Sequence, residues 1–178
     1  MMNRSARFCV AVFCTILTAA AWAQSKPPAV PNADETLSPV VWLVGGTWVA
    51  DVKDASDGTA THIENKIRWA ANHQAIEFVA TFNGKPHYNG FYAYDPAAKS
   101  VGFYYTSSEG ELTIGTATAD SDGKTVHQDF DITHSDGKTG HLRSTLTRDG
   151  NDAYWFAVSM QKDGQWAEVL RIHYLRKA

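Results

Sequence analysis

The sequence predicts an all-β fold, an antiparallel up-and-down β-barrel of about ten strands with a short N-terminal plug helix. After residue 45, short segments of strand-like composition follow one another at a spacing of roughly 8–12 residues. Turn pairs such as Asn83-Gly84 and Asp136-Gly137 separate them, and such pairs adopt the positive φ angles of tight hairpins. Inside the segments apolar residues alternate with polar ones, which is typical of strands with one buried face.

Ten strands are predicted from these patterns. Their expected ranges are 46–54, 60–71, 74–83, 85–95, 100–107, 110–119, 124–134, 139–148, 152–161 and 165–177. A flat sheet of this size would leave two edges unpaired and one apolar face in water, whereas closure into a barrel removes both problems. A two-sheet sandwich fits the same alternation and stays open as the alternative architecture.

The first residues have the three parts of a secretory signal peptide. Arg4 and Arg7 give a positively charged start, residues 8–21 are a short apolar run, and Ala21-Trp22-Ala23 places small residues at the cleavage positions. The apolar run is short for a membrane span, which disfavours an uncleaved anchor helix. We therefore expect residues 1–23 to be removed, and the mature protein to be exported and soluble, either periplasmic or secreted.

Composition argues against several functional classes. Cys9 and Cys14 both lie in the predicted signal peptide, so the mature chain would have neither a disulfide nor thiolate chemistry. Without Arg4 and Arg7 it would carry 14 basic residues against 19 acidic ones, a net charge of −5. A modestly acidic chain does not favour nucleic acid or an anionic membrane surface. We expect neither partner, and no stable membrane insertion after signal cleavage.

The segment before the strands is expected to contain a tether and then a plug. Residues 24–36 are rich in proline, which predicts a flexible, extended tether, and the barrel domain is expected over residues 37–178. Ser38-Pro39 is typical of an N-cap followed by proline at the first helical position. The apolar run Val40 to Val44 would then form a short helix that ends at Gly45 and covers one end of the barrel.

Two sites far apart in the sequence carry a family resemblance. Gly46-Thr47-Trp48 opens the first strand, and Arg176 stands late in the last one. They make the chain resemble the calycins, the lipocalin and fatty-acid-binding-protein class of barrels. More narrowly, Gly90 to Pro96 and the ending Tyr174 to Lys177 make the chain resemble a group of uncharacterised exported bacterial lipocalin-like proteins. The resemblance implies that Arg176 packs over Trp48 to close one barrel end. Ten strands are closer to fatty-acid-binding proteins and nitrobindin-type haem barrels than to eight-stranded lipocalins.

Alternate residues along the strands predict an apolar interior with a few polar groups. The residues expected to bind a small, mostly apolar ligand there are Asn65, Trp69, Phe78, Asn89, Phe91, Phe103, Tyr105, Gln128, Phe130 and Phe156. Asn65, Asn89 and Gln128 would orient the ligand, while small residues such as Ala80 and Ala93 leave space between the rings. The alternative is that the aromatic side chains simply fill the barrel.

An enzyme on the same barrel is the alternative function. A haem-dependent isomerase would need a late histidine such as His173, but the strand period turns His173 outward if Arg176 lies at the barrel end. A non-haem hydrolase or cyclase would need a nucleophile, and neither Ser144 nor Ser159 stands in a nucleophile-elbow motif. We therefore assign no catalytic residue and no cofactor.

Two further interpretations concern the outer face of the barrel. His127, Asp129 and Asp131 share one strand face and have the ligand types for a divalent ion. That face is opposite Val126 and Phe130, so we expect it to be solvated, and we assign no metal site. A protein-interaction module that uses the outer face is the third functional interpretation. The sequence does not indicate an oligomeric state.

Overall fold

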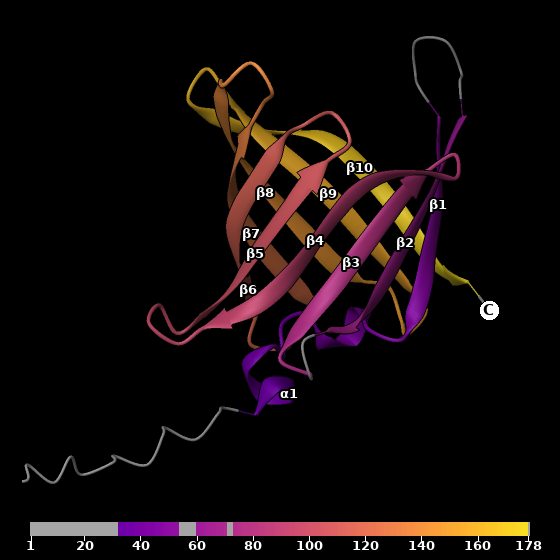
Figure 1. Ribbon diagram of the computed structural model, residues 1–178, viewed down its shortest axis with the longest axis vertical. Coiled ribbons are helices and arrows are strands. Elements are labelled where there is room, and N and C mark those ends of the chain that lie inside the picture. The colour runs from indigo at the N-terminus through magenta and orange to yellow at the C-terminus, as the bar shows by residue number, and fades with distance from the viewer. Residues whose placement is uncertain (1–31, 54–59, 71–72, 178) are drawn as a thin grey trace, which may run out of the picture. The chain divides into compact units, whose positions relative to one another are not determined.

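The computed structural model describes residues 32–53, 60–70 and 73–177, which form a closed barrel of ten antiparallel strands (Figure 1). Each strand pairs with its neighbours in the chain, and β10 (Gln165–Lys177) closes the sheet by pairing with β1 (Gly46–Lys53). The predicted fold class is confirmed, and the sandwich alternative is excluded because the sheet has no open edge. The predicted signal peptide and residues 24–31 of the predicted tether lie outside the described residues.

The strand boundaries agree with the predicted ranges to within two residues. The other strands are β2 (Ala60–Ala70), β3 (Ala75–Phe82), β4 (Lys85–Asp95), β5 (Ser100–Ser107), β6 (Leu112–Ala119), β7 (Thr125–Thr133), β8 (Thr139–Arg148) and β9 (Ala153–Lys162). Short turns join them, and at Asn83-Gly84 and Asp163-Gly164 both residues have positive φ angles, between 50° and 79°. This is the geometry of the two-residue hairpin turns that the Asn-Gly and Asp-Gly pairs predict.

The segment before β1 differs from the prediction in two ways. An extended tether is wrong for its last residues, because Ala33–Thr36 forms a helical turn, α1, whose start is capped by the Asn32 side chain. The helix predicted from Ser38-Pro39 is a single 3-10 turn, η1 (Val41–Leu43), which begins after Val40 and has no side-chain cap. Its apolar residues still do what was expected, since Leu43 is fully buried against the barrel core.

The inward faces of the first three strands are the predicted ones, but that of β4 is not. Asn89 and Phe91 were expected inside and lie outside, where Phe91 is 45% exposed. The cause is a β-bulge at His87, which shifts the pairing of β4 with β3 by one residue. Every side chain beyond the bulge therefore changes face, so that Tyr92 points inward.

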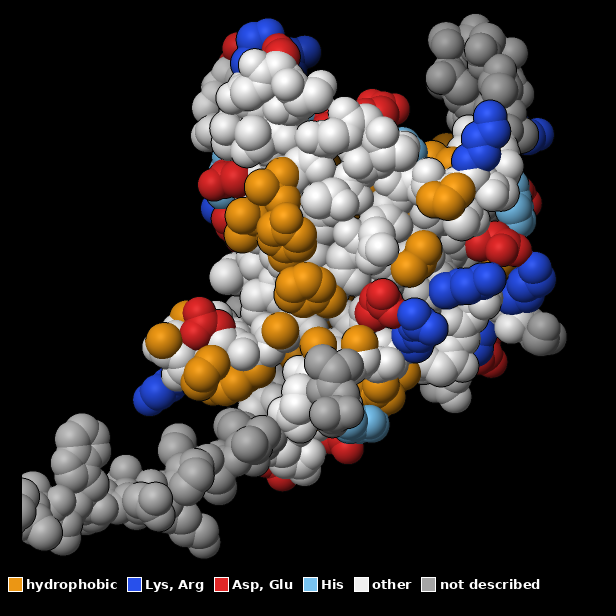
Figure 2. Space-filling model, in the orientation of Figure 1, with side chains coloured by type: hydrophobic (Ala, Val, Ile, Leu, Met, Phe, Trp, Pro, Cys, Tyr) orange, Lys and Arg blue, Asp and Glu red, His pale blue; other side chains and the backbone are white. Residues whose placement is uncertain are grey.

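The outer surface carries a group of exposed apolar residues on neighbouring strands. Phe91 pairs with Tyr104 of β5, and Tyr104 pairs with Ile114 of β6. The Phe91 and Tyr104 rings are stacked with centroids 5.7 Å apart, and all three side chains are exposed. Figure 2 shows hydrophobic side chains grouped on the face of the barrel that is turned to the viewer. Among the described residues, no helix has the length and apolar character needed to cross a membrane.

Candidate functional site

The barrel interior holds a cavity of about 420 Å³. It extends from Leu43 and Tyr154 near the plugged end to Phe82 and Leu142 near the opposite hairpins. Six of the residues predicted to bind a ligand line it: Asn65, Phe78, Tyr105, Gln128, Phe130 and Phe156. The aromatic side chains therefore do not fill the barrel, and the space is large enough for a small organic molecule.

The other four predicted residues do not line the cavity. Phe103 is buried in the core beside Phe130, and Trp69 packs at the edge of the core, stacked on His73 at 3.7 Å. Asn89 and Phe91 lie on the outer face of β4, because the bulge at His87 reverses the face on which they were expected. Tyr88 and Tyr92 take their places inside.

Aromatic rings close the plugged end of the cavity. Trp48 is fully buried, donates its indole N–H to the Leu43 carbonyl at 2.8 Å and meets the Tyr154 ring edge to face at 4.9 Å. The Arg176 guanidinium lies over the Trp48 ring, 4.2 Å from its centroid. The contact that the family resemblance implied is therefore present, and its backbone basis is the direct pairing of Trp48 with Arg176 across β1 and β10.

A chain of three buried side chains forms the main polar group of the interior. The Ser144 hydroxyl donates to Gln128 Oε1 at 2.6 Å, and Gln128 Nε2 donates to Tyr92 Oη at 2.9 Å. Sequence reasoning placed Gln128 inside but missed its two partners. Ser144 faces Gln128 in the register of β7 and β8, so the inward position of Gln128 was a signal for Ser144. Tyr92 was missed because the inward face predicted for β4 was wrong.

Five tyrosines line the cavity: Tyr88, Tyr92, Tyr105, Tyr154 and Tyr174. Burial raises the pKa of each phenol, because the charged form loses its hydration, and the pKa of Tyr88 rises to about 12. The hydrogen bond from Gln128 to Tyr92 offsets part of this effect for Tyr92. All five hydroxyls therefore stay protonated and uncharged over the physiological pH range.

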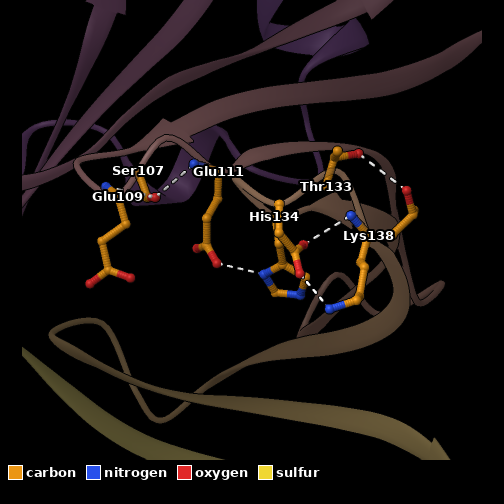
Figure 3. Close-up of polar contacts among 8 residues, drawn as sticks. Ser107, Glu109, Glu111, Thr133, His134 and Lys138 are labelled. Carbon is orange, nitrogen blue, oxygen red and sulfur yellow. Dashed lines mark hydrogen bonds and ion pairs between the residues drawn. The ribbon is translucent and has the colours of Figure 1, made fainter.

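Charged residues gather on the turns at the end opposite the plug, outside the cavity lining. Figure 3 shows Glu111, just before β6, and His134, just after β7, with Glu111 Oε1 and His134 Nδ1 2.7 Å apart. Lys138, in the same turn as His134, pairs with Asp136. These turns, which form the rim of the barrel opposite the plug, are thus polar, and some of their charges pair with one another, while the interior is apolar.

Histidines and carboxylates meet on the outer surface rather than in the cavity. His173 points outward as the strand period predicts: it stacks on Trp155 at 4.2 Å, and its Nε2 lies 3.0 Å from an Asp149 oxygen. His127, Asp129 and Asp131 are all exposed, on the solvated face where they were expected. No group of three or more metal-ligating side chains is arranged around an ion site in the described part of the chain.

These features define a class: a closed ten-stranded β-barrel with an internal apolar cavity. The chain belongs to the family described as "Protein of unknown function (DUF1579)", which matches residues 43–176. The crystal structure of Rv2717c from M. tuberculosis is similar, with a TM-score of 0.54 and 18% sequence identity over 84% of this chain and 99% of that one. At this identity the likeness concerns the fold alone. No curated protein matches the chain.

Proposed function

We propose that the protein binds a small, mostly apolar molecule inside the barrel. The observation that carries the proposal is the cavity itself, since a barrel of this size with a packed interior would have no such space. Its wall is mainly aliphatic and aromatic, and Gln128, Asn65 and the tyrosine hydroxyls are the few polar groups that orient a ligand. An empty apolar cavity costs stability, so this space is better explained by an occupant than by packing.

The proposal also includes the protein class, lipocalin-like, and the location, outside the cytoplasm, that the sequence suggests. A plugged barrel whose Trp48 and Arg176 close one end is what a lipocalin-like protein would have. Export rests on the signal peptide predicted for residues 1–23. Sequencing the amino terminus of the exported protein should give Gln24 as the first residue, and an intact Met1 in that material would contradict cleavage.

The test compares the same type of substitution, phenylalanine to tryptophan, on the inner and on the outer face of the barrel. Phe78 lines the cavity and lies 5.5 Å from Tyr92 between ring centroids, whereas Phe91 is outside. Phe78→Trp adds volume inside and should weaken binding of an uncharged fluorescent dye, N-phenylnaphthylamine, by about tenfold. Phe91→Trp adds the same atoms to the surface and should leave the affinity unchanged, as should Asp129→Ala on β7.

Titrations of the purified, delipidated protein and its variants measure these affinities. Thermal unfolding of each variant shows whether it is folded under the conditions of the assay. If the wild-type protein does not bind the dye, or if Phe78→Trp and Phe91→Trp change the affinity equally, the interior is not the binding site.

A further inference from the structure

Among the residues that the structure describes, the cavity wall contains none that is charged at neutral pH. It is formed by 23 residues, and none of them is Asp, Glu, Lys, Arg or His. The groups in it that titrate are the five tyrosine hydroxyls, whose burial already shows that this environment disfavours a negative charge. A ligand with a buried charge would therefore find no counter-ion among the described lining side chains, and burying an unpaired charge is strongly unfavourable.

The arginines at the plugged end of the cavity, Arg176 and Arg148, make their contacts outside it. Arg176 lies over Trp48, and it also contacts the Trp42 carbonyl at 3.4 Å and an Asp152 oxygen at 3.3 Å. Arg148 lies over the Trp42 ring at 4.7 Å. Neither arginine lines the cavity, so neither is placed to pair with a carboxylate in it.

The opposite end of the cavity disfavours anions as well. Tyr88 lines the cavity near the hairpin ends, and besides its burial the charges of Glu111 and Glu109 contribute to raising its pKa. Glu111 is paired with His134, but no cation among these contacts faces Tyr88 inside the cavity. A fatty acid anion would therefore be left unpaired inside.

The interior nevertheless offers hydrogen bonds. Tyr92 Oη accepts a hydrogen bond from Gln128, and its own hydrogen has no acceptor among the described residues. If the Gln128 amide were reversed, the free hydrogen would belong to Ser144, which does not line the cavity, and Tyr92 Oη would remain an acceptor for a ligand hydroxyl. The interior also has an unpaired acceptor: Asn65 Oδ1 is buried and lacks a donor in the described part of the chain. An unpaired buried acceptor of this kind is unfavourable, and a ligand hydroxyl could donate its hydrogen to it, whereas a ketone or ester oxygen can only accept from a donor such as Tyr92.

We propose that the cavity selects uncharged amphiphiles with a hydrogen-bonding oxygen, such as alcohols, ketones or esters, over carboxylates and cations of the same chain length. This inference rests on the proposed function and narrows its ligand class. It differs from what a fatty-acid carrier requires, because such a carrier must provide a partner for the carboxylate.

A matched series of ligands tests the selection. Decanol, methyl decanoate, decanoate and decyltrimethylammonium share their alkyl chain and differ in the head group, and each is titrated as a competitor of N-phenylnaphthylamine on the wild-type protein, below the concentration at which it aggregates. Near neutral pH, decanol and the ester should bind at least about 100-fold more tightly than either ion. The apparent affinity for decanoate should fall about tenfold per pH unit above its pKa, because only the neutral acid enters, while that for decanol stays constant.

Tyr92→Phe tests the hydrogen bond, with Tyr104→Phe as the matched control on the outer face. Loss of one hydrogen bond should weaken decanol binding by about tenfold in Tyr92→Phe and not in Tyr104→Phe. Affinity for the dye, measured in the same samples, shows whether the cavity of each variant is intact.

The possible results separate the two proposals. Decanoate or decyltrimethylammonium binding as tightly as decanol, or decanoate binding independently of pH, would overturn the uncharged-ligand inference and leave interior binding standing. If the protein binds neither the dye nor any of the four molecules, the proposed function itself fails.

Discussion

Trp48 and Arg176 show how single residues close one end of the barrel. Gly46 precedes Trp48 by two positions, and a Cβ atom at Gly46 would lie 2.6 Å from Arg176 Nη1. Glycine there lets the guanidinium lie flat over the indole, so the spacing of the sequence motif has a steric reason. Arg176 also reaches Asp152 and the Trp42 carbonyl, and therefore ties η1, β1 and the turn before β9 together.

A double-mutant cycle measures this contact. Trp48→Ala should lower the free energy of unfolding by about 3–5 kcal/mol, because a fully buried indole is lost. Arg176→Ala should cost about 1–2 kcal/mol, and the double variant should lose less than the sum by about 0.5–1 kcal/mol, the size of a cation–π contact. Denaturant unfolding provides the four values, with exposed Lys85→Ala as a control near zero. Simple additivity within about 0.3 kcal/mol would contradict the packing of Arg176 on Trp48.

At the scale of the element, β4 is the strand whose inward and outward faces the sequence did not predict. A straight count from the two-residue turn at Asn83-Gly84 pairs Phe78 with Asn89, which places Asn89 and Phe91 inside. The structure pairs Phe78 with Gly90, because the bulge at His87 adds one residue to β4. Aromatic residues occur on both faces of this strand, so its hydrophobic pattern does not reveal the shift.

The other strands were predictable because their patterns are one-sided. In β2 and β7 most inward positions are apolar and the outward ones are charged or polar, and in β3 every inward position is apolar, which indicates the faces of these strands. The strand ends were predictable because hairpin turns that contain glycine lie between the strands. The polar partners of Gln128 were not predictable in the same way, because Tyr92 depends on the bulge and Ser144 on the register of β8 with β7.

The plug before β1 should contribute to stability despite its short length. Leu37 and Leu43 are fully buried in the core cluster, so Leu37→Ala and Leu43→Ala should each lower the free energy of unfolding by about 2–5 kcal/mol. The same truncation at exposed Leu175 should change it by no more than about 0.5 kcal/mol. Chemical denaturation compares the three variants. Equal effects at all three positions would show that the plug is not packed against the barrel.

At the scale of the whole molecule, a closed sheet separates two chemically different surfaces. Outside, charged and histidine side chains pair across neighbouring strands, as His141 does with Asp131 and Arg143 with Asp129. Inside, the wall is neutral at physiological pH and encloses about 420 Å³. The two surfaces share the same strands and alternate residue by residue, so a ligand that enters the barrel should contact only alternate side chains.

Methyl NMR of the protein with bound decanol tests interior binding most directly. Ile63 and Ile172 line the cavity, whereas Ile114 and Leu175 are exposed on the outer face. With isotope-labelled isoleucine and leucine methyl groups, nuclear Overhauser effects from the decanol chain should reach Ile63 and Ile172 and not Ile114 or Leu175. Contacts to Ile114 or Leu175 without contacts to the inner methyl groups, or none at saturating decanol, would contradict a ligand site inside the barrel.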